Sequence, residues 1–136
     1  MRRNVQPKRV SGREAIRAIP QRARLLFPPS CGVTVSLLDA LYEERGRFED
    51  LRLFTGLIFV EHPVWQHLGG NIKLSTWHIA AAVQKSVDEG KADWFPIRMS
   101  QVASLFAQDG PLAVDAVLVQ VSPPDEQGYV SLGAHV

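Results

Sequence analysis

A chain of 136 residues, 46% of them hydrophobic, is long enough to bury one core and too short for two domains of ordinary size. No uninterrupted apolar stretch approaches the roughly 20 residues that span a bilayer, so the composition argues against a helical membrane protein and favours a soluble one. The single cysteine, Cys31, excludes an internal disulfide, and no secretory signal is visible; both observations favour a cytoplasmic location.

The formal net charge of +1 hides a strong asymmetry along the chain. Residues 1–24 carry eight Lys or Arg against one Glu, whereas residues 25–136 carry seven against thirteen Asp or Glu. We expect residues 1–10 to form a basic tail. No aromatic side chain is interleaved with these cations to stack on bases, so neither a nucleic acid nor a membrane is the expected partner. An Arg-rich start is also typical of mitochondrial transit peptides, the alternative location for a eukaryotic protein.

The first half of the chain is predicted to alternate helices with strands. Ser11 and Glu14 have the spacing of a capping box, which predicts a short helix that runs to about Ile19 and ends at Pro20. The following segments are predicted, in order, as strand 24–27, turn 28–32, helix 34–44, strand 51–59 and a shorter strand 71–75.

The second half continues the same alternation, with helix 79–89, strand 93–96, helix 101–107 and strand 113–121. Strands separated by helix-length segments indicate βαβ units. We therefore predict an α/β fold with a mostly parallel open sheet flanked by helices, and expect residues 53–59, 93–97 and 114–121 to be its central strands.

The residues after strand 113–121 form the best candidate binding loop. Two prolines end the strand, and in open α/β sheets ligands bind at the carboxyl ends of strands. Gly128 is available for a positive φ, and Asp125 either accepts amides of its own loop or orients a substrate group. The candidate substrate-binding residues here are Ser122, Pro123, Pro124, Asp125, Gly128, Tyr129, Ser131 and Gly133.

The turn around Cys31 is a second candidate. Ser30 and Gly32 are expected to donate amide or hydroxyl groups to an acyl or phosphate group. Cys31 as a nucleophile requires a base partner, and the sequence assigns none. His62 and His67 lie five residues apart with a proline between them, which disfavours a metal site on one helix face. No catalytic residue and no metal ligand is therefore predicted in this chain.

Two blocks of the sequence carry a resemblance to a known family. Residues 117–133, which include the Ser-Pro-Pro-Asp loop, and residues 89–96, Glu-Gly-Lys-Ala-Asp-Trp-Phe-Pro, resemble the acetyl-CoA hydrolase and CoA-transferase family. The likeness is weaker in residues 37–41 and 11–15. The turn near Thr34 departs from the family, which has more glycine there and usually a proline.

The resemblance implies an amino-terminal, truncated CoA-transferase-type domain over residues 11–136. The implied protein moves coenzyme A between an acyl-CoA and a small carboxylic acid, uses coenzyme A as substrate and no other cofactor, and is a homo-oligomer when complete. The family's catalytic glutamate belongs to a carboxy-terminal half that these residues do not include, so this chain alone is expected to be inactive. A sugar-phosphate isomerase on a related fold and a non-catalytic binding or assembly module are the alternatives.

Overall fold

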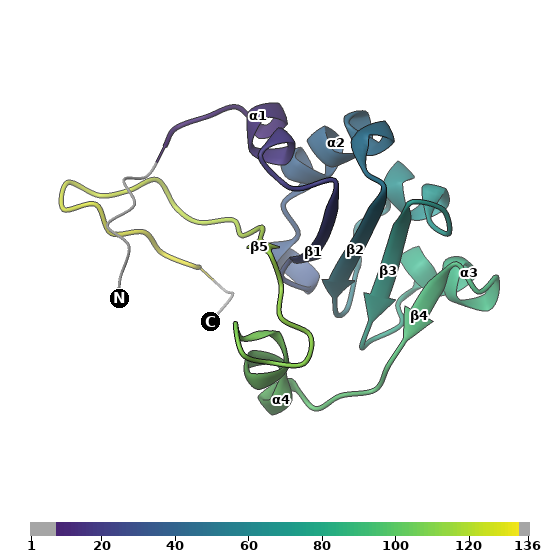
Figure 1. Cartoon of the computed structure of the whole chain (residues 1–136). Helices are drawn as coiled ribbons and strands as arrows, with labels where there is room; N and C mark the ends of the chain where they lie inside the picture. Colours follow the sequence, from purple (N-terminus) through teal and green to yellow (C-terminus); the bar gives the residue numbers. More distant parts are fainter. Residues whose placement is uncertain (1–7, 134–136) are drawn as a thin grey trace.

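The computed structural model describes residues 8–133, and its centre is a five-stranded sheet (Figure 1). The strand order is β4-β3-β2-β1-β5, and every neighbouring pair is parallel. This confirms the predicted open α/β architecture. Residues 1–7 of the expected basic tail lie outside the described residues. The strands are β1 Arg22–Leu26, β2 Asp50–Thr55, β3 Ile72–Thr76, β4 Ala92–Trp94 and β5 Ala116–Val117.

Helices connect the strands as the sequence predicts, except that the β2–β3 connection, for which no helix was predicted, contains the 3-10 helix η3 (Pro63–His67). The α-helices are α1 Gly12–Arg17, α2 Val35–Glu43, α3 Ala81–Asp88 and α4 Met99–Phe106, and three short 3-10 helices are η1 Ser30–Gly32, η2 Arg45–Arg47 and η3 Pro63–His67. The capping box of α1 is confirmed: the Glu14 amide donates to Ser11 Oγ at 3.2 Å, and the Ser11 amide donates to the Glu14 carboxylate at 2.8 Å. Between residues 8 and 133, no helix is long and apolar enough to cross a membrane.

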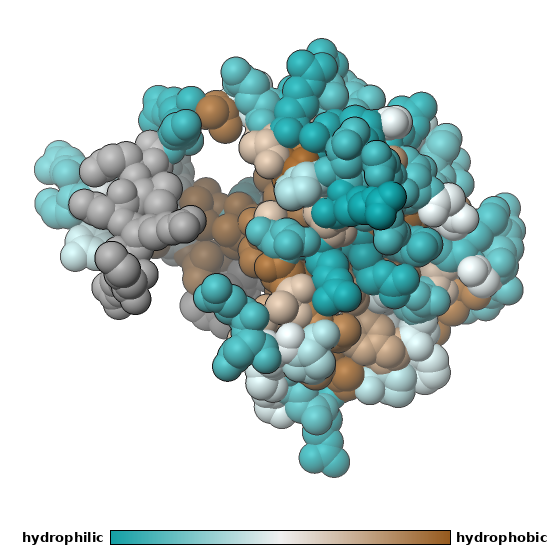
Figure 2. Space-filling model, viewed as in Figure 1, coloured by the Kyte–Doolittle hydropathy of each residue, from teal (hydrophilic) through white to brown (hydrophobic). Residues whose placement is uncertain are grey.

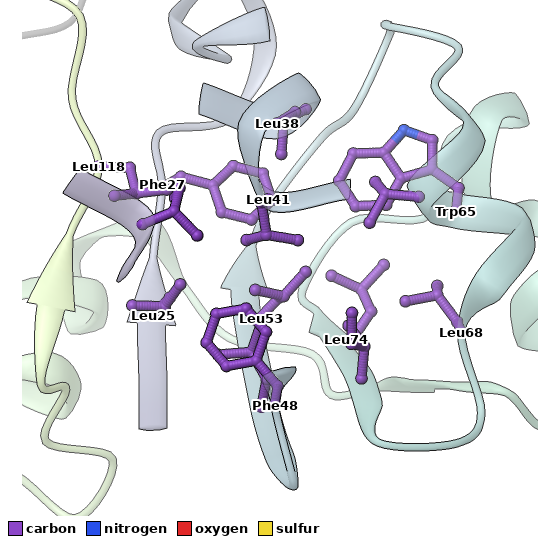
Figure 3. Packing of buried hydrophobic residues seen from close by; sticks show 14 of the residues in the cluster. Leu25, Phe27, Leu38, Leu41, Phe48, Leu53, Trp65, Leu68, Leu74 and Leu118 are labelled. Atoms are coloured by element: carbon purple, nitrogen blue, oxygen red, sulfur yellow. The ribbon is translucent and has the colours of Figure 1, made fainter. Parts of the chain in front are cut away.

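One face of the sheet packs against α1, α2 and η3 to form the main core. Alternate residues of the strands point to this face, because side chains of a strand alternate between its two sides. Leu25, Leu53 and Leu74 are fully buried there and meet Leu41 from α2 and Trp65 from η3 (Figure 3). Apolar burial of this kind, worth about 25 cal/mol per Å², holds the sheet to its helices.

The other face is only partly covered. Toward the carboxyl ends of the strands, Phe54, Trp77 and Phe106 of α4 form a small aromatic cluster with Phe95 packed against it. Trp65 and Trp77 are therefore core residues, whereas Trp94 is 53% exposed at the edge of the sheet.

The sheet corrects the predicted choice of central strands. Strand 71–75, predicted to be minor, is the interior strand β3, whereas residues 93–97 and 114–121 contribute only the two edge strands. Pro96 lacks an amide hydrogen and follows β4 closely. Strand 51–59 ends at Thr55, and Phe59 lies in an exposed loop. Apolar composition alone does not distinguish a central strand from an edge strand.

Candidate functional site

The turn after β1 is held by hydrogen bonds within the chain. Ser30 adopts a positive φ of 58°, which is uncommon for a residue with a Cβ. Its amide donates to the Leu57 carbonyl at 2.5 Å, and the Gly32 amide donates to the Pro29 carbonyl at 3.2 Å. Both amides that the sequence suggested as ligand donors are thus already used. The turn leaves Cys31 exposed while Gly32 is buried.

Residues 119–133 form an extended arm that leaves the sheet after β5 (Figure 1). Every residue of the arm is exposed, so the predicted buried strand 113–121 is wrong: only Ala116 and Val117 pair with β1, and Leu118 is the last buried residue. The arm doubles back on itself. The Ser122 amide donates to the Ser131 carbonyl, and the Asp125 amide donates to the Tyr129 carbonyl, both at 2.9 Å.

The tip of the arm is a turn built around Asp125. Its carboxylate accepts the amides of Gln127 at 3.0 Å and of Tyr129 at 2.8 Å, and its carbonyl accepts the amide of Gly128 at 3.0 Å. Gly128 has a φ of 86°, which confirms the predicted positive φ. Of the two roles considered for Asp125, the structure shows the first, in which the carboxylate accepts amides of its own loop.

The base of the arm and the Cys31 turn enclose a cleft of about 450 Å³. Two segments distant in sequence therefore meet at one cleft. Figure 2 shows brown, hydrophobic atoms where the arm meets the body of the molecule. The cleft is lined by Cys31, Gln120, Val121, Ser122, Pro123, Ser131, Leu132 and Gly133.

Four of the ten predicted binding residues line this cleft: Ser122, Pro123, Ser131 and Gly133. Ser30 and Gly32 flank the residue that reaches it, while Pro124, Asp125, Gly128 and Tyr129 lie at the tip of the arm. Sequence reasoning missed Gln120, Val121 and Leu132. The alternation of Val119 and Val121 with polar residues was the available signal, but it was interpreted as a buried strand.

The side chains that line the cleft are apolar or polar and uncharged. None of its lining residues carries a carboxylate or an imidazole. The Ser122 hydroxyl accepts the Ser131 amide at 2.9 Å and donates to the Pro123 carbonyl at 3.1 Å, so it stabilises the arm. No hydrogen bond within residues 8–133 uses the amides of Val121 or Leu132. These two amides remain available as donors to a ligand.

The other residues considered in the sequence have structural roles. His62 is buried, and its Nδ1 accepts the Val64 amide at 3.2 Å, which leaves Nε2 as the protonated nitrogen that donates to the Asp39 carboxylate at 3.1 Å. Both ring nitrogens are therefore occupied. The Asp115 carboxylate, just before β5, accepts the Arg24 amide at 2.8 Å. Within residues 8–133 no group of three His, Cys, Asp or Glu side chains is arranged to hold a metal ion.

Three buried side-chain polar atoms lack a hydrogen-bond partner among residues 8–133. Thr55 Oγ1 ends β2 and Trp77 Nε1 follows β3, so both lie at the carboxyl ends of strands, whereas Thr34 Oγ1 precedes α2. Buried polar groups are normally paired, and an unpaired one costs about 1–3 kcal/mol. The same edge of the sheet that leads to the cleft therefore carries unsatisfied hydrogen-bonding capacity.

An open parallel sheet with a cleft near the carboxyl end of β1 places this chain among the α/β proteins. Its fold matches the crystal structure of RipA from Yersinia pestis with a TM-score of 0.76 at 22% identity, covering 91% of this chain and 31% of RipA. Over residues 1–136 the sequence matches the acetyl-CoA hydrolase/transferase N-terminal domain family. The chain belongs to that family.

Two curated relatives agree with this assignment. The chain is 28% identical over 131 residues to the 4-hydroxybutyrate coenzyme A transferase of Clostridium kluyveri, a match that covers 93% of this chain and 29% of the relative. It is 31% identical over 103 residues to a succinyl-CoA:acetate/propanoyl-CoA:succinate CoA transferase of Fasciola hepatica, covering 74% and 21%. The chain thus spans less than a third of the length of each relative.

Proposed function

We propose that this chain forms one wall of the acyl-CoA site of an enzyme that moves coenzyme A between an acyl-CoA and a small carboxylic acid. The observation that carries the proposal is the cleft between the Cys31 turn and the base of the arm, in a chain that belongs to a CoA-transferase and hydrolase family. The two curated relatives, both named as CoA transferases, support the substrate class.

The catalytic glutamate of this proposal belongs to a carboxy-terminal part outside these 136 residues. Partial coverage of the relatives supports this, since the match covers 29% of the longer C. kluyveri protein. In the proposed reaction the glutamate attacks the thioester carbonyl, coenzyme A thiolate leaves, and a mixed anhydride forms. The thiolate then attacks the glutamyl carbonyl of the anhydride, which gives a glutamyl thioester and releases the carboxylate.

The role of this chain in that reaction is to bind and orient. Each tetrahedral intermediate carries a negative oxygen, and amides placed in advance are the usual donors to it. The unused amides of Val121 and Leu132 are the candidates in the cleft. The apolar side chains of the same residues provide a surface for a short acyl group. Cys31 lies opposite them as a polar neighbour.

The first experiment tests where the nucleophile lies. The 136-residue chain, incubated with acetyl-CoA and a carboxylate acceptor, is expected to transfer no acyl group and to form no hydroxylamine-sensitive glutamyl thioester. Turnover by this chain that disappears when one of its own glutamates is replaced would overturn the assignment of the glutamate to another part.

The second experiment tests the arm in a polypeptide that continues into the family's carboxy-terminal part. Gly128→Val is expected to lower turnover by about 100-fold, because a β-branched residue strains the positive φ at the tip, and the hydrogen bonds that join the two sides of the arm carry this distortion to the Val121 and Leu132 amides at its base. Its Cβ would meet nothing within 4 Å, so the effect comes from the backbone and not from a clash.

Gly70→Val is the matched control, since Gly70 is also exposed and open to a Cβ but does not have a positive φ. A conservative change at exposed His67 is likewise expected to have a smaller effect. Full turnover of Gly128→Val, or loss of folding without selective loss of activity in the folded fraction, would show that the arm is only a structural corner.

A further inference from the structure

A second hollow, separate from the cleft, lies on the partly covered face of the sheet. Its volume is about 370 Å³, and it shares no lining residue with the cleft. The apolar part of its lining comes from Phe54, Phe95 and Leu112, beside the aromatic cluster under α4. The polar part comes from Arg24, Arg52, Ser75 and Asp93.

The polar side of the hollow belongs to a row of cations across three strands. Arg24 of β1 lies opposite Arg52 of β2, which lies opposite Lys73 of β3. Residues directly opposite in neighbouring strands share a face of the sheet, and like charges in such positions are destabilising. In Figure 2 this face is largely teal over the strands, with brown atoms below, beside α4.

Carboxylates compensate two of the three cations. Arg52 pairs with Asp93 at 3.2 Å, and Lys73 pairs with Asp50 at 3.3 Å. The guanidinium of Arg24 has no ion pair within residues 8–133. Asp115 is close in the fold, but its carboxylate accepts the backbone amide of Arg24 at 2.8 Å.

Ser75 connects this charged row to the floor of the hollow. The side chain is almost fully buried, with 3% of its surface exposed, and its Oγ lies 3.4 Å from Arg52 Nη1 and 3.5 Å from Asp93 Oδ2. Arg52 is therefore held at the hollow by two partners. Of the three cations in this row, Arg24 is the one without a carboxylate partner within residues 8–133.

We propose that this hollow binds a small amphipathic carboxylate. Its apolar part, an aromatic ring or a short branched chain, packs on Phe54, Phe95 and Leu112, and its carboxylate pairs with Arg24 beside Arg52. Guanidinium and carboxylate groups form short paired hydrogen bonds, and a planar apolar group is favoured against aromatic edges. The site does not depend on the proposed function of the cleft.

The test uses 4-phenylbutyrate as the probe in a ¹⁵N-¹H NMR titration of the 136-residue chain. Saturable shifts are expected at the amides of Phe54, Ser75 and Phe95. The neutral analogue 4-phenylbutanamide is expected to bind about tenfold more weakly, because it has the same apolar part without the charge. Shifts confined to Cys31 and Ser131 would place the probe in the cleft and overturn the proposal, as would the absence of saturable shifts.

A pair of matched variants tests the assigned cation. Arg24→Gln is expected to raise the Kd of 4-phenylbutyrate about tenfold. Arg22→Gln is the control, because Arg22 lies on the same strand and face but pairs with Glu49 at 2.9 Å and does not line the hollow. Equal Kd values for the two variants, or equal binding of acid and amide by the unmodified chain, would overturn the proposal.

Discussion

Gly56→Ala is expected to destabilise the protein by overpacking the carboxyl edge of the sheet. A Cβ at Gly56 would lie 2.5 Å from Trp77 Nε1 and 2.7 Å from Trp77 Cε2, closer than real Cβ atoms approach. Trp77 is 3% exposed and is packed by Phe106 and Phe95, so its ring has little room to move. Insertion of a methyl group into such a site costs typically about 1–3 kcal/mol.

We therefore expect the free energy of unfolding to fall by about 2 kcal/mol and Tm by roughly 5–10 °C. Urea unfolding followed by far-ultraviolet circular dichroism measures the change without relying on Trp77 fluorescence. Gly46→Ala is the control: Gly46 is exposed, does not have a positive φ, and would place its Cβ more than 4 Å from any neighbour. Its effect is expected to stay within about 0.5 kcal/mol.

The contact between residue 56 and Trp77 can be tested further with Trp77→Phe, which removes the indole nitrogen that the new Cβ would meet. The double variant is expected to lose less stability than the sum of the single variants, with a coupling of about 1 kcal/mol. A Gly56→Ala protein as stable as Gly46→Ala, or strictly additive losses in the double variant, would refute the packing argument.

Three other outcomes follow from the hydrogen bonds described above. Ser11→Ala should destabilise α1. The Ser11 amide and then its hydroxyl donate to the Glu14 carboxylate and lower its pKa below the ordinary 4.5; the variant keeps the amide and removes the hydroxyl. The share of stability that comes from the hydroxyl is present above that pH and is lost as pH falls through the lowered pKa, so a difference between variant and parent that grew in acid would contradict this. Asp115→Ala should speed hydrogen exchange at the Arg24 amide, measured by NMR, and unchanged exchange would show that the carboxylate does not protect it. His62→Ala should cost about 1–3 kcal/mol in urea unfolding because it leaves the buried Val64 amide unpaired, and a neutral result would show that water replaces the ring.

The sequence predicted the class of fold because its signals are local. The capping box at Ser11 and Glu14, the proline at position 20 and the alternation of apolar runs with helical segments each depend on residues close together in the chain. Parallel strands need crossover connections, so the alternation of element types already implies a parallel sheet. The positive φ at Gly128 was predictable for the same reason, because turn chemistry is local.

The position of each strand in the sheet was decided only by tertiary structure. Residues 113–121 are as apolar as a buried strand, yet only Ala116 and Val117 pair with a neighbour. Residues 72–76 look less distinctive and lie in the interior of the sheet, because β2 and β4 flank them. Burial of a strand depends on neighbours distant in sequence, and hydrophobicity along the chain does not encode which neighbour comes next.

The candidate sites, like the fold, were indicated in part by the sequence and in part only by the tertiary structure. The motif at residues 122–133 indicated a binding loop, and the family likeness at these residues agrees with the family match over the whole chain. The meeting of Cys31 with Ser131 across the cleft required the folded chain. So did the alignment of Arg24, Arg52 and Lys73, residues that are 28 and 21 positions apart and become neighbours only through the register of three parallel strands. Sequence fixes which groups are available, and long-range strand pairing decides which of them face one ligand.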